Sequence, residues 1–213
     1  MTLRHELETI TFILLASILC VLAIVAIRQS RHITPFHLEV PLAANFLTPI
    51  PSPTPVPSVS TTEQISSDGT KKMTMKEIKS GTTTSYTFTL SDIPTKTSST
   101  IFFQTIATTS AMSIPFNVFS PQNTYFYLEQ NDGGKKHFLV FHSSGENFAG
   151  GYKYLDVTQM FGSYSSDYHT PLATGWGDDG LLVINAKSNS GQNASFWFEV
   201  ASEHFIPLAN YFP

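Results

Sequence analysis

Arginine is absent from most of this chain. Arg4, Arg28 and Arg31 are the only arginines, and the formal net charge of the chain is −4. Recognition of nucleic acids and phosphates depends on clustered positive charge and on the planar, bidentate guanidinium group. An acidic body without arginine therefore argues against a nucleic-acid partner.

Cysteine is nearly absent as well, because Cys20 is the only one. A single cysteine allows no disulfide within the chain, so cysteine usage does not identify the redox compartment. Cys20 follows the bulky Leu19 inside an apolar run, where a lipid-attachment site would carry a small residue. We interpret Cys20 as a lipid-facing or helix-packing residue.

Familiar catalytic motifs are also missing. The sequence contains no Gly-x-Ser-x-Gly elbow, no phosphate-binding glycine-rich loop before a helix and no His-Glu-x-x-His. His137 and His142 are five residues apart on a predicted strand, which places them on opposite faces and prevents joint metal binding. Asp178 and Asp179 lack the alternating carboxylates of a calcium loop, so we expect them to be turn residues.

Acidic residues of the body could in principle supply the paired carboxylates of a glycosidase. The candidates are Glu129, Glu146, Asp156, Glu199 and Glu203. The distance between two carboxylates decides this chemistry, and a sequence does not give that distance. We therefore assign no catalytic, cofactor-binding or metal-ligating residue and expect no cofactor, and the sequence favours a protein without catalytic activity.

A long apolar run lies near the N-terminus. Ile10–Ile27 spans 18 residues without a charge, a proline or a glycine. As a helix it would be roughly 27 Å long, close to the bilayer's hydrocarbon thickness of about 30 Å. A cleaved secretory signal would have a shorter apolar region and a small-residue cleavage site. The sequence predicts a single-pass transmembrane helix over 10–27, within an N-terminal region 1–31, with the lipid bilayer as its partner.

The next segment, 32–62, is rich in proline, serine and threonine, although residues 33–47 are more apolar than a pure linker. Prolines at every second position from 49 to 57 favour an extended chain of about 3.1 Å per residue. We predict a stalk that holds the following domain away from the bilayer. The positive charges after the apolar run favour a cytoplasmic C-terminus, whereas a stalk favours the outside. We expect the domain to be extracytoplasmic.

Residues 63–213 are expected to form a β domain with an internal repeat. The segment is rich in Thr, Phe, Tyr and Val, has frequent Gly, Asn and Asp turns, and shows no helical periodicity. Three similar units begin near Ser66, Ser120 and Gly177, at intervals of 54 and 57 residues. Each starts with a turn and continues into a hairpin, and the predicted hairpins are 66–91, 120–142 and 177–200. A period of this length is typical of blades or arrays.

Additional elements are predicted beside the hairpins. Residues 100–106 and 204–209 have the pattern of a fourth strand in the first and third units. The middle unit instead carries residues 152–161, where Asp156 and Gln159 have the spacing of a helix N-cap and its third residue. We expect Gly162 to end that helical turn. We also expect the lysine-rich strand 71–79 to protect an open sheet edge.

The turns carry a family resemblance. It rests on Phe119-Ser120-Pro121, on Trp176 with Asp179-Gly180, and on Ser67-Asp68-Gly69. These turns resemble the repeat of TolB-like β-propellers and are similar to WD-repeat-like and prolyl oligopeptidase blades, here on a membrane-anchored protein of bacterial type. The resemblance implies an all-β fold of three degenerate blades, with Phe119 and Trp176 in equivalent buried positions. Three blades fall short of the four that close a ring, so we expect an open arrangement, with a β-sandwich as the alternative.

Three functional hypotheses follow. The first is a membrane-anchored binding or scaffolding module at the cell envelope, with a protein or glycan ligand. The second is an envelope hydrolase whose catalytic carboxylates are dispersed among loops, which a carboxylate cluster or a Ser-His pair in a pocket would support. The third is a structural subunit that assembles with copies of itself, as a homo-oligomer.

Overall fold

The computed structural model describes residues 56–212 of the chain. This part is an all-β domain of three four-stranded antiparallel sheets. The predicted transmembrane helix (10–27) and residues 32–55 of the predicted stalk (32–62) lie outside the described residues. Across 56–212, no helix has the length and apolar character needed to cross a membrane.

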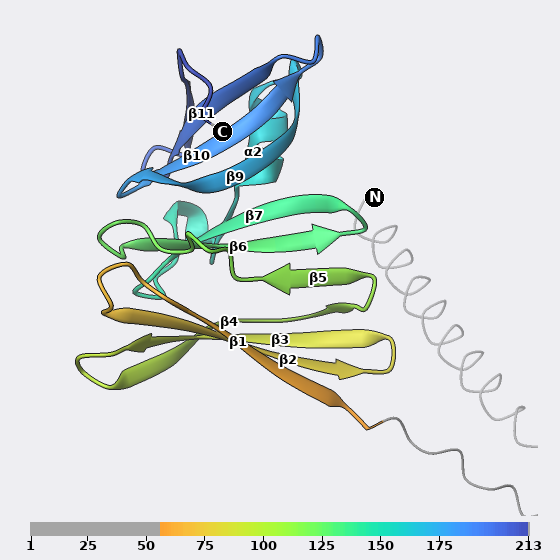
Figure 1. Ribbon diagram of the computed structural model, residues 1–213, viewed down its shortest axis with the longest axis vertical. Coiled ribbons are helices and arrows are strands. Elements are labelled where there is room, and N and C mark those ends of the chain that lie inside the picture. The colour runs from red at the N-terminus through yellow and green to blue at the C-terminus, as the bar shows by residue number, and fades with distance from the viewer. Residues whose placement is uncertain (1–55, 213) are drawn as a thin grey trace, which may run out of the picture. The chain divides into compact units, whose positions relative to one another are not determined.

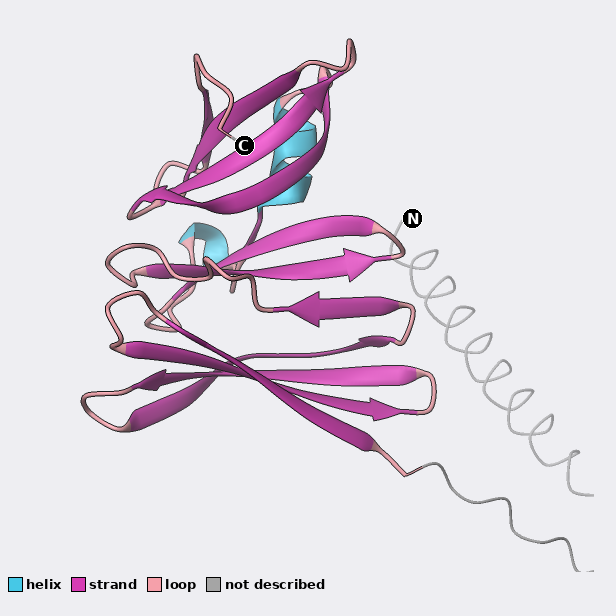
Figure 2. Ribbon diagram, viewed as in Figure 1, coloured by secondary structure: helices cyan, strands magenta, loops and turns pink. Residues whose placement is uncertain are grey.

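Each sheet is built from four strands that are consecutive in the chain (Figure 1). The first sheet comprises β1 (Ser58–Ile65), β2 (Lys71–Ser80), β3 (Thr83–Asp92) and β4 (Thr97–Ala107). The middle sheet comprises β5 (Ser110–Ser113), β6 (Tyr125–Asp132), β7 (Lys135–His142) and β8 (Leu155–Asp156). The third sheet comprises β9 (Tyr168–Asp178), β10 (Leu181–Ser188), β11 (Asn193–Glu199) and β12 (His204–Pro207). Two short helices, η2 (Ala149–Gly151) and α2 (Val157–Tyr164), follow β7 and β8 (Figure 2).

The predicted repeat is confirmed. The hairpins expected over 66–91, 120–142 and 177–200 are β2–β3, β6–β7 and β10–β11, the second and third strands of their sheets. All three are antiparallel with continuous registers, such as Met75 opposite Phe88 and Ile184 opposite Phe196. The fourth strands expected at 100–106 and 204–209 are β4 and β12.

One hydrophobic core lies between the first and middle sheets, and a second lies between the middle and third sheets. The middle sheet therefore contributes to both. Phe126 and Leu128 of β6 belong to the core with the first sheet, whereas Tyr127 between them belongs to the core with the third sheet. The same division on β7 assigns Leu139 to the first core and Phe138 to the second. Successive side chains on a strand point to opposite faces, so a strand buried on both faces reads as a continuous apolar run. This explains the sequences YFYL and FLVF.

The last strand of the middle sheet, β8, has only two residues, and the helix α2 follows it directly. Asp156 is the N-cap of α2, and its carboxylate accepts a hydrogen bond from the Gln159 backbone amide at 3.0 Å, as predicted. The prediction for Gly162 was wrong, since α2 continues to Tyr164 and is capped at Ser165. Phe161, which is fully buried, faces the third sheet and holds this last turn in the core.

Two further predictions need correction, one on a domain boundary and one on a sheet edge. β1 begins at Ser58, so strand structure extends into the segment predicted as stalk, 32–62. All but one residue of β1 are exposed, so its Ser/Thr-rich sequence shows no apolar alternation and reads like a linker. The lysine-rich strand β2 lies between β1 and β3 and protects no edge.

The arrangement of three sheets differs from the alternative of a β-sandwich, which has two. Within residues 56–212, no strand of the first sheet pairs with a strand of the third, so backbone hydrogen bonds do not join the sheets into a ring. The edge strands β1 and β9 therefore each keep one unpaired side in the described part of the chain. Backbone donors and acceptors on these sides of β1 and β9 have no strand partner in the described part of the chain.

Candidate functional site

The turns that begin the first two units have the same hydrogen bonds, and the turn of the third unit shares their positive-φ position. In the first, the Ser66 amide donates to the Lys71 carbonyl, and the Lys71 amide donates to Ser66 Oγ, both at 2.9 Å. In the second, Ser120 and Tyr125 repeat this pattern, with the Tyr125 amide 3.0 Å from Ser120 Oγ. The fourth positions, Gly69, Asn123 and Gly180, all have positive φ, at 72°, 59° and 95°. Only glycine and asparagine adopt this conformation readily.

Side chains of these turns link the first sheet to the middle one. Asp68 accepts hydrogen bonds from Ser66 Oγ at 2.6 Å and from the Thr70 amide at 3.0 Å. Asn123, which replaces the glycine of the first turn, donates from Nδ2 to Asp68 Oδ2 at 2.8 Å. Asparagine tolerates the positive φ of this turn position, and its side chain therefore provides a hydrogen bond between the first and middle sheets.

A second link joins the middle sheet to the third. The second turn has Gln122 at the position of Asp68, so it lacks its own carboxylate. Asp179 of the third turn provides one: it accepts from Ser120 Oγ, and from the Gln122 amide at 3.1 Å. We call Asp68, Asn123, Ser120 and Asp179 the turn ladder.

Both ladder carboxyl groups are held in the ionised form. The hydrogen bond from Ser66, followed by those from the Thr70 amide and Asn123, lowers the pKa of Asp68 well below its ordinary value. Burial alone would raise the pKa of Asp179, but hydrogen bonds from Ser120, Thr124 and the Gln122 amide outweigh it and lower that pKa. Charged acceptors form the stronger hydrogen bonds, so ionisation strengthens the ladder.

The ladder predicts an acid-sensitive stability. A carboxyl group whose pKa is lowered on folding stabilises the fold above its unfolded pKa of about 4, and this contribution is lost as the pH falls below that value. We expect the Asp68→Asn/Asp179→Asn variant to melt below the wild type at pH 6 and the gap to narrow towards pH 2.5. Thermal unfolding followed by circular dichroism measures it, with the exposed Asp167→Asn as control. A gap that does not change with pH would remove the carboxylates from this role.

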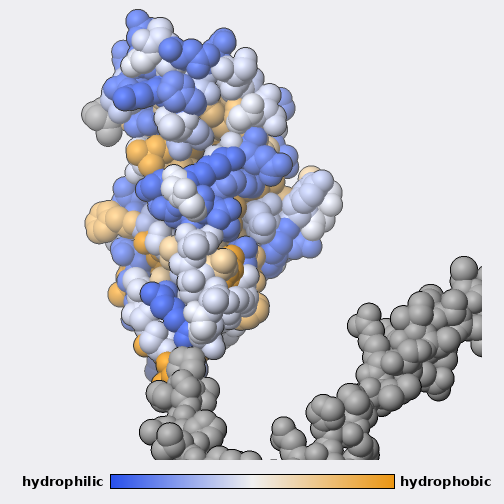
Figure 3. All heavy atoms as spheres, turned by 90° about the vertical axis from the view of Figure 1, so that its right-hand side faces the viewer, coloured by the Kyte–Doolittle hydropathy of each residue, from blue (hydrophilic) through white to orange (hydrophobic). Residues whose placement is uncertain are grey.

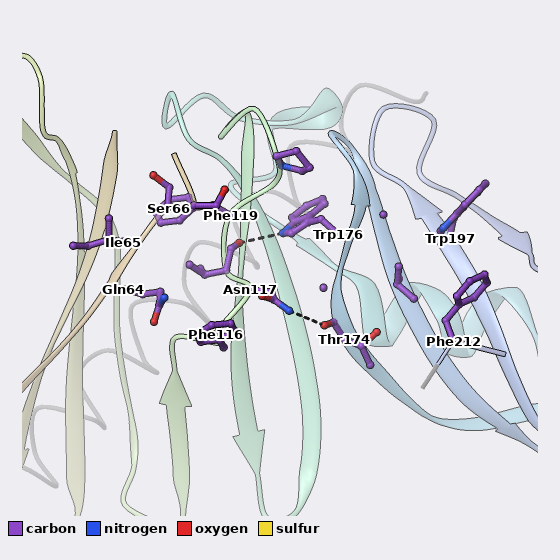
Figure 4. Close-up of a pocket in the computed structure, with 16 residues that line it drawn as sticks. Gln64, Ile65, Ser66, Phe116, Asn117, Phe119, Thr174, Trp176, Trp197 and Phe212 are labelled. Atoms are coloured by element: carbon purple, nitrogen blue, oxygen red, sulfur yellow. Dashed lines mark hydrogen bonds between the residues drawn. The ribbon is translucent and has the colours of Figure 1, made fainter. Parts of the chain in front are cut away.

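A groove of about 670 Å³ opens where the three sheets meet (Figure 4). We call it the junction groove. It is lined by the end of β1 and its turn (Gln64–Ser67), the connection between β5 and β6 (Phe116–Phe119 and Pro121), β9 (Thr174–Gly177), and Val183, Trp197 and Phe212. Two hydrogen bonds fix its wall: Trp176 Nε1 donates to the Val118 carbonyl at 3.2 Å, and Asn117 Nδ2 to the Thr174 carbonyl at 3.4 Å.

The junction groove is lined without a single charged side chain. Its polar side chains are amides and hydroxyls, such as Gln64 and Ser67. Large apolar side chains are exposed around it, and Phe116 is 83% exposed. A phenylalanine side chain with this much exposure to water contributes little to folding stability, because a side chain stabilises the fold by removing apolar surface from water.

Two glycines of β9 shape one side of the groove. A Cβ at Gly175 would lie 3.1 Å from Asn117 Nδ2, and a Cβ at Gly177 would lie 3.0 Å from Trp197 Nε1. Both distances are shorter than ordinary van der Waals contact. Glycine at these positions therefore allows Asn117 and Trp197 to lie directly against the strand.

The residues considered for metal or acid–base chemistry are dispersed. His137 Nδ1 lies 2.8 Å from Asp156 Oδ2, whereas His142 packs against the rings of Tyr125 and Phe148. Among residues 56–212, no group of three metal-ligating side chains converges. The carboxylate candidates have separate surroundings: Glu129 pairs with Lys136, Asp156 caps α2, and Glu199 accepts from Ser202. None of these residues lines the junction groove.

Phe119 and Trp176 are equivalent in position but only partly buried, so the prediction of burial was wrong. Each packs against a core, Phe119 against the first and Trp176 against the second. Their other sides line the junction groove. The aromatic residues before the second and third turns therefore each contact a core and line the groove.

The face of the domain shown in Figure 3 is largely hydrophilic, with hydrophobic residues in small separate groups. Known proteins give no further guide to the groove. In comparisons with protein-family models, curated proteins and solved structures, nothing matches this chain. The resemblance to propeller blades therefore rests on the turns and on the three repeated sheets alone.

Proposed function

We propose that the β domain is a non-catalytic binding module and that the junction groove is its binding site. The observation that carries this proposal is the groove's composition: a concave, uncharged site with a strongly exposed phenylalanine, Phe116, between the edge strands of two sheets. Ligand sites are typically concave and largely apolar, with a few polar groups that fix orientation. The groove has this character without the paired acids, nucleophile or metal ligands of a catalytic centre.

The ligand that we propose is an extended, uncharged peptide segment of another protein. β1 and β9 are edge strands, and both line the groove. An edge strand offers a row of backbone donors and acceptors to an added strand, while neighbouring pockets take its alternate side chains. A charged segment is disfavoured, because burying an unpaired charge costs far more than burying an apolar group.

Phe116 provides the test of this proposal, since its removal should affect binding without affecting the fold. Peptides selected from a displayed heptapeptide library on the purified full chain should be uncharged and alternate in apolar residues. Loss of one buried phenylalanine contact is worth about 1.5–3 kcal/mol, so Phe116→Ala should weaken binding by about tenfold or more. Titration calorimetry measures the change.

The matched control is Phe103→Ala on β4, because Phe103 is 60% exposed and lies outside the groove. It should leave the affinity unchanged. Selection of charged peptides, or equal affinities for the two variants, would count against the groove as the site. Binding of a neutral oligosaccharide in place of any peptide, lost in Phe116→Ala, would keep the site and replace the ligand.

The module is anchored, in this proposal, through Ile10–Ile27 and held outside the membrane by the stalk. The apolar run and the stalk before residue 56 lie outside the described residues, and the apolar run carries the argument. We expect the mature chain to retain residues 10–27 and to resist extraction from membranes by alkaline carbonate. A mature N-terminus after residue 27 would show a cleaved signal instead.

A further inference from the structure

A second hollow, independent of the junction groove, collects positive charge. Its volume is about 530 Å³, and it lies between the β6–β7 hairpin turn, the start of α2 and the third sheet. We call it the lysine hollow. Lys135, Lys136 and Lys187 line it, which is three of the nine lysines in a chain whose net charge is −4. No aspartate or glutamate lines it.

The charges in the hollow are incompletely neutralised. Lys136 Nζ lies 2.9 Å from Glu129 Oε1. Within the described part of the chain, no carboxylate lies within ion-pair distance of Lys135 or Lys187; the same holds for Lys76 and Lys96 outside the hollow, whereas Lys71, Lys72 and Lys79 each have one. Like charges that converge without acids repel one another, and a bound anion would relieve that repulsion.

Neutral donors lie beside these lysines. The Asn193 amide, the Thr170 hydroxyl and the Tyr211 hydroxyl line the same hollow. Thr170 has φ +49°, a conformation that is a genuine outlier for a β-branched residue. Strain of this kind tends to persist where the surrounding structure uses it, and functional sites are common among such places.

We propose that the lysine hollow binds an acidic saccharide through its carboxylate, sulfate or phosphate groups. The unpaired ammonium groups of Lys135 and Lys187 bind the anionic groups, and the amide and hydroxyls bind the sugar hydroxyls. The volume exceeds what an inorganic ion needs and falls within the range of about 300–1,000 Å³ for small-molecule sites. The absence of arginine favours point-charge contacts over bidentate recognition.

Titration of the full chain with trigalacturonate, and with neutral maltotriose as comparison, tests this proposal. Trigalacturonate should bind and maltotriose should not, and the affinity for trigalacturonate should fall as salt is raised from about 50 to about 300 mM, because salt screens the attraction between exposed charges. Sulfated and phosphorylated trisaccharides identify which anionic group binds most tightly. No binding by any of the three acidic sugars, or equal binding of maltotriose, would overturn the proposal.

Charge variants locate the site. Lys135→Glu/Lys187→Glu should abolish binding, and Lys135→Gln/Lys187→Gln should weaken it at least tenfold. All four positions used here and in the control are exposed, so the fold should be retained. The control, Lys76→Glu/Lys96→Glu, makes the same change of net charge outside the hollow and should keep the wild-type affinity. Equal losses in the two glutamate variants would assign the effect to net charge and contradict the site.

Discussion

Replacing Phe126 by alanine should lower the free energy of unfolding by about 3–5 kcal/mol, the usual cost of removing a large buried aromatic side chain. Phe126 is fully buried, and its ring stacks on that of Phe141 with centroids 5.0 Å apart and planes at 4°. It also pairs with Phe119, the aromatic residue before the second turn. The cavity would therefore open between the first and middle sheets.

Urea denaturation of the full chain measures this loss, and two probes make it more informative. Trp176 and Trp197 are the only tryptophans, and both belong to the third sheet, so fluorescence reports on a sheet that does not contain Phe126. Because the middle sheet contributes to both cores, we expect fluorescence and far-ultraviolet circular dichroism to shift together, as in a single cooperative transition. Phe103→Ala should change stability by no more than about 0.5 kcal/mol. A tryptophan transition that stays at its wild-type midpoint would show that the cores unfold separately.

The central hairpins of all three sheets could be predicted because the polarity pattern of each strand indicates which of its faces are buried. Tyr86, Phe88 and Leu90 alternate with polar residues on β3, and all three are buried on one face. β6 and β7 instead carry continuous apolar runs, which match burial on both faces. In each case, period-two alternation or its absence follows from how many faces of the strand are covered.

The first strands of the first and middle sheets, β1 and β5, could not be predicted in the same way. β1 is exposed at nearly every residue, and β5 has only four residues. Such strands are positioned by backbone pairing with a neighbour, and their own side chains carry little signal. The end of α2 failed for a related reason: the propensity of Gly162 to stop a helix was outweighed by the packing of Phe161.

The aligned turns also contain the residues that link neighbouring sheets. Aligning Ser66, Ser120 and Gly177 also aligns Asp68, Gln122 and Asp179. The structure turns this alignment into the ladder, in which Asp179 of the third sheet supplies the carboxylate that the second turn lacks. A sequence shows that Gln122 departs from the pattern, but only the stacking of the sheets shows which residue compensates.

The junction groove was missed because its lining comes from segments far apart in the chain that meet only when the sheets pack. Its local signals were present but ambiguous. Gly177 is predicted to be the first residue of the third turn, and Gly175 and Phe116 lie outside every predicted hairpin. Their role depends on side chains from other elements, Asn117 and Trp197, which lie against the two glycines.

The second large effect is expected at Phe161, whose replacement by alanine should also lower the free energy of unfolding by about 3–5 kcal/mol. The side chain is fully buried, and its ring makes edge contacts with Phe196 and Phe205, with centroids 5.1 Å away in each case. These contacts connect α2 to the third sheet. The loss should therefore appear in tryptophan fluorescence and in circular dichroism alike.

Gln159→Ala is the matched control on the same helix. Gln159 is exposed, and its capping bond to Asp156 uses the backbone amide, which the substitution keeps. Alanine also has the higher helix propensity, so stability should change by no more than about 0.5 kcal/mol. If Phe161→Ala cost less than about 1 kcal/mol, α2 would be a surface attachment to the middle sheet. A loss of the expected size, with the control unchanged, would establish that this helix closes the second core, whereas the first core contains no helical residue.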